Sequence, residues 1–232
     1  MPRLTGIAMA PSIPRLPMPP SAQRPATGSP GDDRADAGDA PLRHYARRMR
    51  GVLVEVPEQM LAERRRLGLD GRDEMWEGVL HMVPPAGGRH QRLGSSLLMT
   101  LGPVAERWGL VVSYETGLFR NGDDYRVPDL LFYRPEHASD RGAEGADLVV
   151  ELRSPGDESY AKLDFYAALG VREVLVVDPA GPAVELFRLV GERLLPVSAD
   201  TEGGVRSDVL AVRFHTSGDA LRLTWVGGEA AL

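Results

Sequence analysis

The chain has 232 residues, of which 43% are hydrophobic, and a net charge of −6. This length fits one domain with an extension or two small domains, and the apolar content suffices for a core. Because there is no cysteine, disulfides, thiolate zinc sites and cysteine nucleophiles are excluded. No apolar run approaches the roughly 18 residues of a membrane span, and prolines interrupt any signal-peptide core, so we expect a cytoplasmic protein.

The charge is distributed unevenly along the chain. Residues 1–50 hold eight arginines against four aspartates, a net charge of +4, which leaves −10 for the remainder. An acidic body argues against passive, high-affinity binding to nucleic acid, which usually needs a basic surface. It does not exclude an enzyme in which a divalent metal ion supplies the local positive charge.

Residues 1–48 are rich in Pro, Ala and Gly. Such a composition cannot bury enough apolar surface to fold, so we expect a disordered tail. A start codon assigned too far upstream would explain part of it equally well. The basic residues around its end fit a solvated boundary better than a phosphate contact; they are Arg43, Arg47, Arg48 and Arg50. Residues 49–232 are the expected folded domain.

The periodicity of apolar residues predicts alternating strands and helices in the first half of this domain. In chain order they are a strand at 52–54, a helix at 58–67, a strand at 74–83, a helix at 90–108 and a strand at 110–115. Pro103 should kink or shorten the second helix. In the strand at 74–83, Glu77 and His81 would share one face.

A hairpin turn opens the second half of the domain, at Asn121-Gly122-Asp123-Asp124. Further elements follow: strands at 125–133 and 147–152 with a surface loop at 135–147 between them, a helix at 157–169, and strands at 173–177, 184–189, 194–197, 209–214 and 220–225. This order predicts an α/β class, on the border with α+β, built on a mixed sheet.

Two acidic residues stand inside strand-like apolar runs, where a charge is costly unless it is paired or bound to a metal. They are Asp129, after Pro128, and Glu151. If their strands are neighbours, the carboxylates approach within the about 5 Å of cross-strand pairs. They would then repel, and one would take up a proton unless a hard cation bridged them. Mg²⁺ suits such a site, and Mn²⁺ is a substitute.

Lys162, eleven residues after Glu151, is the single lysine of the chain. From the predicted 157–169 helix it would orient water, hold a phosphate or, if desolvated, act as a base. Arg153 stays protonated and can only clamp a phosphate. From spacing alone a plainer interpretation stays open, in which Glu151 pairs with Arg153 or Arg126 and Lys162 is solvated.

Several stretches of the chain resemble the Uma-two family, a bacterial group placed among the PD-(D/E)XK restriction-endonuclease-like folds. The resemblance covers about 52–225 and implies a central mixed β-sheet flanked by helices. The stretches that carry it are Val127 to Asp129, Asp147 to Pro155, Lys162 to Tyr166, Gly170 to Glu173 and Val176 to Pro179, with Glu74 to Met82 and Pro84 to His90 upstream.

The resemblance implies a metal-dependent endonuclease that hydrolyses phosphodiester bonds, with DNA as the expected substrate and Mg²⁺ as the expected cofactor. It makes Asp129 and Glu151 the metal-binding acids and Lys162 the catalytic lysine. In the parent pattern the lysine stands two residues after the second acid, where this chain has Arg153, so the lysine has moved to the following helix. A homodimer is expected, because one site cuts one strand at a time.

Glu77 and His90 are additional candidates. Glu77 matches the acid of the family's Glu-Gly element and would assist catalysis as a further metal or water ligand. His90 opens a helix, where it would meet a substrate phosphate, as Arg153 would, or only cap the helix. The alternative function is a nuclease fold kept as a binding or regulatory module with little turnover. A lysine-dependent carbonyl enzyme lacks any supporting motif.

Overall fold

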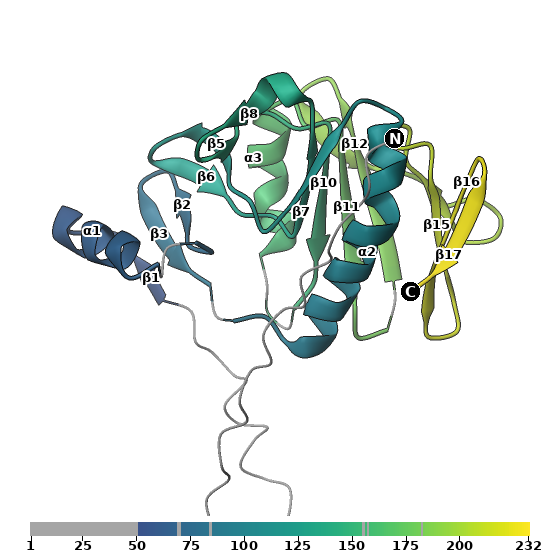
Figure 1. Ribbon diagram of the computed structural model, residues 1–232, viewed down its shortest axis with the longest axis horizontal. Coiled ribbons are helices and arrows are strands. Elements are labelled where there is room, and N and C mark those ends of the chain that lie inside the picture. The colour runs from purple at the N-terminus through teal and green to yellow at the C-terminus, as the bar shows by residue number, and fades with distance from the viewer. Residues whose placement is uncertain (1–50, 69–70, 84, 155, 157, 182) are drawn as a thin grey trace, which may run out of the picture. The chain divides into compact units, whose positions relative to one another are not determined.

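The computed structural model describes residues 51–68, 71–83, 85–154, 156, 158–181 and 183–232. The predicted tail at 1–48 and the arginines around its end lie outside the described residues. The described part of the chain contains three α-helices and the strands of three sheets, which Figure 1 labels where there is room. None of the helices in those ranges is long and apolar enough to cross a membrane.

The helices agree with the sequence pattern except at their ends. The helical elements are α1 (Glu58–Arg66), α2 (Gly88–Glu106) and α3 (Leu163–Ala168), with the 3₁₀ turns η1 (Pro135–His137) and η2 (Ser159–Lys162). Pro103 does not end α2, since the helix continues past it to Glu106, two residues short of the predicted end. Pro103 and Met99, whose carbonyl would have bonded to the missing N–H, are both exposed. Water can therefore donate a hydrogen bond to the Met99 carbonyl oxygen in its place.

The central sheet is mixed and has six strands in the described residues, in the order β13-β12-β11-β10-β7-β4. Their bounds are β4 (Val111–Tyr114), β7 (Leu130–Tyr133), β10 (Leu148–Leu152), β11 (Glu173–Asp178), β12 (Ala183–Val190) and β13 (Arg193–Pro196). The β10–β11 pair is parallel and β10–β7 is antiparallel. The predicted α/β class with a mixed sheet is confirmed.

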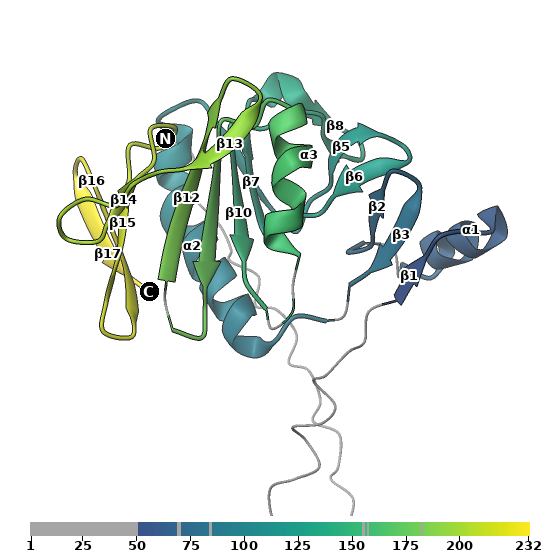
Figure 2. The ribbon, with the colours of Figure 1, turned by 180° about the vertical axis from the view of Figure 1, so that it is seen from behind.

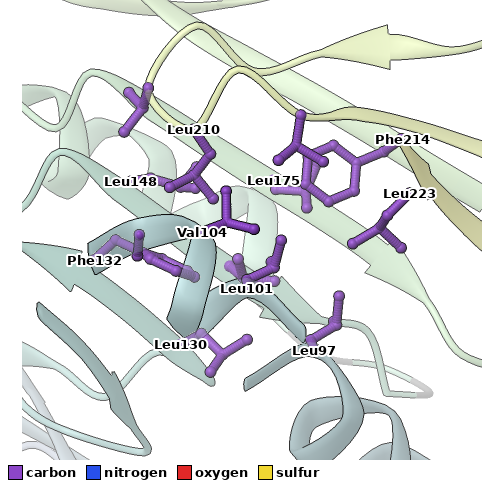
Figure 3. Close-up of a cluster of buried hydrophobic side chains, with 14 of the residues drawn as sticks. Leu97, Leu101, Val104, Leu130, Phe132, Leu148, Leu175, Leu210, Phe214 and Leu223 are labelled. Carbon is purple, nitrogen blue, oxygen red and sulfur yellow. The ribbon is translucent and has the colours of Figure 1, made fainter. Parts of the chain in front are cut away.

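Helices cover both faces of this sheet, α2 on one side (Figure 1) and α3 on the other (Figure 2). On the α2 side, Leu97 and Leu101 belong to one buried cluster with Phe132 and Leu175 of the sheet and Phe214 of the C-terminal region (Figure 3). Leu131 of β7 and Val149 of β10 point to the opposite face of the sheet, where they form a second cluster with α3. Asp129 and Glu151 stand two residues from Leu131 and Val149, respectively, so they lie on the same face of the sheet as this second cluster.

A second sheet of short strands supports the loop that enters β7, with the order β1-β3-β2-β6-β5-β9-β8 over the described ranges. Its bounds are β1 (Gly51–Leu53), β2 (Glu74–Trp76), β3 (Val79–Met82), β5 (Leu118–Asn121), β6 (Asp124–Arg126), β8 (Ala138–Ser139) and β9 (Gly142–Ala143). The predicted turn at Asn121–Asp124 is confirmed by the pairing of its end residues. The predicted surface loop at 135–147 instead contains η1, β8 and β9.

Two predicted strands are each divided in the structure. Residues 74–83 form the β2–β3 hairpin, in which Trp76 pairs with Val79 across a two-residue turn, Glu77-Gly78. Both turn residues have positive φ, 50° and 87°, as a type I′ hairpin turn requires. Residues 125–133 divide into β6 and β7, which belong to different sheets. Pro128 stands between them and has no N–H to donate to a ladder.

The C-terminal strands form a third sheet, β14 (Val205–Arg206), β15 (Arg213–Ser217), β16 (Ala220–Trp225) and β17 (Gly228–Ala231). The predicted strand at 209–214 is therefore displaced toward the C-terminus. Ala211 has a φ of 56°, which no extended strand accommodates. The buried Glu173 of β11 accepts hydrogen bonds from Ser207 Oγ and from the backbone N–H of Asp208, so this region is tied to the central sheet.

The segment after β10 places a short helix over the sheet. It begins as the 3₁₀ turn η2, which contains Lys162, and continues as α3. Gly170 ends it with a φ of +72°, while the N–H of Gly170 bonds to Ala167 O and that of Val171 to Tyr166 O. This is the Schellman arrangement, which favours glycine at that position. Lys162 and Tyr166 thereby lie one helical turn apart above β10.

Candidate active site

The register of β7 and β10 brings the two predicted acids together. Leu130 pairs with Val150 at the end of the ladder, and the next residue on each strand is Asp129 or Glu151. The backbone N–H of Leu152 donates to Asp129 Oδ2 at 2.7 Å. The neighbouring strands assumed from the sequence are thus observed, with both carboxylates at one end of the central sheet.

Glu151 is buried and is bound by two side chains from the following helical segment. Lys162 Nζ lies 3.1 Å from its Oε1 and 3.3 Å from its Oε2. The Tyr166 hydroxyl donates a hydrogen bond to Oε1. Lys162, with 12% of its side chain exposed, is therefore not the solvated helix residue of the plainer interpretation.

A third carboxylate completes this cluster. Glu74 of β2 is 2% exposed, and its Oε1 lies 2.8 Å from Lys162 Nζ. Sequence reasoning did not select Glu74, although it stands in the Glu74 to Met82 stretch that resembles the family. One signal for Glu74 was available in the sequence. It stands two residues before Trp76 on a short strand, so the two side chains share one face.

His90, in the first turn of α2, reaches the other acid. Its Nε2 lies 2.9 Å from Leu152 O and 3.3 Å from Asp129 Oδ1. Since a carbonyl oxygen can only accept, Nε2 carries a proton, and in the neutral ring Nδ1 is an acceptor. Nδ1 is buried and has no hydrogen-bond partner in the described ranges. No side chain caps α2, so His90 contacts the acid and does not serve as a cap.

Burial of several acids with a single cation sets the electrostatics of the cluster. Burial raises the pKa of Asp129 to about 7 and that of Glu151 to about 7, and the other acids of the cluster add to this, although Lys162 lowers both values. Burial alone would lower the pKa of Lys162, but the charges of Glu151, Glu74 and Asp129 raise it above its ordinary value. Burial lowers the pKa of His90, so its ring is neutral at pH 7. The cluster holds more negative than positive charge and favours a cation.

A family model described as "Putative restriction endonuclease", Uma2, matches residues 58–217, which is more than half of the chain. The chain belongs to the Uma2 family. No curated protein matches it.

A solved structure supports the fold of this Uma2 protein. It is the crystal structure of "a putative nuclease belonging to DUF820" from Anabaena variabilis ATCC 29413, which is 17% identical to the chain, with a TM-score of 0.50. The match covers 60% of this chain and 83% of the other. At this identity the likeness shows a shared fold. The restriction-endonuclease-like sheet flanked by helices, expected from the resemblance, agrees with both comparisons.

Glu77, the further acid predicted from the family's Glu-Gly element, lies elsewhere. It is exposed in the β2–β3 turn, and its backbone N–H donates to Asp124 Oδ1 at 3.3 Å. Across the described residues, no hydrogen bond or ion pair joins its carboxylate to Asp129, Glu151 or Lys162. The type I′ turn is the physical reason, because the chain reverses at Glu77 and directs it away from the strand face that carries Glu74.

The two arginines considered as partners of Glu151 have other contacts. Arg153 lies at the end of β10, with its NH1 3.7 Å from Asp178 Oδ2 and 40% of its side chain exposed. Arg126 is buried between the rings of Trp76 and Phe165, 4.3 and 4.2 Å from their centroids. Its NH1 donates to Asp124 Oδ1 and to Met75 O. The ion pairs assumed in the plainer interpretation are therefore not formed.

The carboxylates of the cluster are oxygen donors, which hard divalent cations prefer. No group of three or more His, Asp or Glu side chains within the described ranges has an arrangement that would hold a metal ion by itself. Mg²⁺ is commonly bound by only one or two carboxylates, with water and substrate phosphate as its other ligands. Two buried carboxylates, with one ammonium paired to Glu74 and Glu151, fit such an open site.

Proposed function

We propose that this protein is a Mg²⁺-dependent endonuclease that hydrolyses phosphodiester bonds of DNA. The convergence of Asp129, Glu151 and Lys162 at one end of the central sheet supports this function most directly. Membership of the Uma2 family, whose model is described as "Putative restriction endonuclease", supports the same function. Mn²⁺ would substitute for Mg²⁺, since both prefer oxygen ligands.

Each side chain has a role that follows from its contacts. Asp129 and Glu151 would hold the metal ion, which when bound activates water and stabilises charge on the phosphate. Lys162 remains protonated because three carboxylates surround it, so it would donate to a phosphate oxygen and would not act as the base. Tyr166 and the N–H of Leu152 fix the orientation of the two acids.

His90 and Arg153 are the proposed contacts to substrate phosphate. The neutral His90 ring lies beside Asp129, and the half-exposed Arg153 guanidinium lies at the end of the same strand as Glu151. Two such sites would be needed to cut both strands of a duplex, so we also propose a homodimer.

Supercoiled plasmid provides the first test. The wild-type chain should nick it in Mg²⁺ or Mn²⁺ and not in EDTA. Asp129→Asn should lower the rate by at least about 100-fold, because Asp129 is a proposed direct ligand and even outer-shell changes at metal sites cost about 10–100-fold. Lys162→Met should also lower the rate while leaving Mn²⁺ binding measurable by calorimetry. A folded wild-type protein that cuts neither DNA nor RNA with either metal would contradict this function.

The acidic charge of the folded part favours a second candidate, a nuclease fold kept as a binding or regulatory module with little turnover. Outside residues 1–50 the net charge is −10, and basic surfaces usually accompany tight nucleic-acid binding. Fluorescence anisotropy with labelled DNA separates the two functions. Metal-dependent binding without cleavage by the wild type would favour the second.

A further inference from the structure

Lys162 is held between two carboxylates that come from different parts of the chain. Its Nζ lies 2.8 Å from Glu74 Oε1 and 3.1 Å from Glu151 Oε1. An ammonium group has three N–H donors and can serve both acids at once. The shorter contact is made to Glu74, which the proposed metal site does not use.

Glu74 is fixed by donors that do not depend on Glu151. Its Oε2 accepts from Trp76 Nε1 at 2.8 Å, and its Oε1 accepts from the backbone N–H of Val127 at 3.0 Å. The position of Trp76 is fixed in turn by two contacts. Its ring stacks on His81 with centroids 4.3 Å apart, and the Arg126 guanidinium lies over the ring in a cation–π contact. Glu74 is therefore a buried, fully bonded anion in a rigid setting.

We propose that Glu74 is a positioning residue, which keeps the Lys162 ammonium beside the acidic pair while Glu151 is engaged by a metal ion. This inference rests on the proposed function. A carboxylate that shares its charge with a metal ion offers less of it to a neighbouring ammonium. Glu74 then remains as the full counter-charge of Lys162. Without Glu74, Lys162 would pair with Glu151 alone in the described part of the chain and would compete there with the metal ion.

The test uses the full chain and a matched pair of variants. Glu74→Gln keeps the shape of the side chain and removes its charge. Asp73→Asn is the control, because Asp73 is 3% exposed and forms a 2.6 Å ion pair with Arg64. Both variants break one buried ion pair on neighbouring residues, but only the first touches Lys162. Circular dichroism and thermal unfolding establish that both are folded.

The single lysine permits a direct readout by NMR spectroscopy. Labelling with ¹³C,¹⁵N-lysine gives one side-chain signal, that of Lys162. In the wild type and in Asp73→Asn, the ammonium protons should stay protected from exchange after Mg²⁺ is added. In Glu74→Gln, Mg²⁺ should make them exchange at least about tenfold faster, since the amide oxygen is a weaker acceptor and the remaining charged acceptor, Glu151, is shared with the metal ion. Equal exchange in all three proteins would overturn the inference.

Kinetics give an independent readout. In Glu74→Gln, kcat should fall about 10–100-fold while KM for DNA stays within about twofold, and the Mg²⁺ concentration for half-maximal rate should rise. Asp73→Asn should behave as the wild type. A wild type that never cleaves contradicts the proposed function, whereas a cleaving wild type with Glu74→Gln equal to Asp73→Asn contradicts this inference alone. If Glu74→Gln does not fold, Trp76→Phe, which removes the indole donor, should shift both readouts in the same direction and less far.

Discussion

Individual residues at the end of the central sheet carry unbalanced charge. Asp129 and Glu151 were predictable because an acid inside an apolar run needs a partner, and Lys162 because no other lysine exists. Glu74 was not predictable from its type alone. Its role depends on a contact with Lys162, 88 residues later in the sequence, which only the tertiary structure creates.

The raised pKa values of the acidic pair predict how stability depends on pH. Burial raises the pKa of Asp129 and of Glu151 to about 7, so between about pH 4.5 and 7 the folded chain binds protons that the unfolded chain releases. Metal-free protein should therefore lose on the order of 1–3 kcal/mol of unfolding free energy as pH rises from 5 to 8. Burial lowers the pKa of His90, so this residue makes the unfolding free energy rise with pH. It involves one proton, whereas the two acids involve two, so the net change remains a loss.

Urea unfolding in EDTA at pH 5, 6, 7 and 8 measures this dependence. Asp129→Asn removes one of the two titrating acids and should flatten the slope. A wild-type free energy that is constant or rises across this range would show that the acids are ionised throughout.

At the level of elements, the β2–β3 hairpin shows where the sequence pattern misled. Continuous alternation over 74–83 predicted one strand, with Glu77 and His81 on the same face. The turn at Glu77-Gly78 reverses the chain, so that His81 instead stacks on Trp76. Glu-Gly is a weaker turn signal than Asn-Gly, although Gly78 was available as a hint.

The same turn offers a stabilising substitution. Glu77 has a φ of 50°, a conformation that asparagine tolerates better than glutamate. Glu77→Asn should raise the free energy of unfolding by about 0.5–1 kcal/mol, as measured by urea denaturation, and should leave cleavage unchanged. A loss of activity in a folded Glu77→Asn protein would return Glu77 to the list of functional residues.

On the scale of the whole molecule, one buried carboxylate joins two sheets. Glu173 is 1% exposed and accepts hydrogen bonds from Arg188 of β12 and from the segment between β14 and β15. The alternating helices and strands made the central sheet predictable. The third sheet was only partly predictable, because its short strands are held by such contacts and carry little periodicity of their own.

Removal of this connection should be costly. Glu173→Ala leaves Arg188 without its buried partner, and we expect a loss of about 3–5 kcal/mol in unfolding free energy. Asp208→Ala is the control, because Asp208 pairs with the same arginine but is 60% exposed. It should cost at most about 1 kcal/mol. Similar losses in both variants would show that the two sheets are held together by apolar packing.

The indole of Trp76 gives the protein an intrinsic optical reporter of its own site. Its N–H is bonded to Glu74, while Trp108 donates to Leu210 O and Trp225 packs against the α2-side core. Of the three tryptophans, Trp76 alone contacts a charged group of the acidic cluster in the described structure. Emission from this ring therefore reports on the contact between Glu74 and Lys162 without any added label.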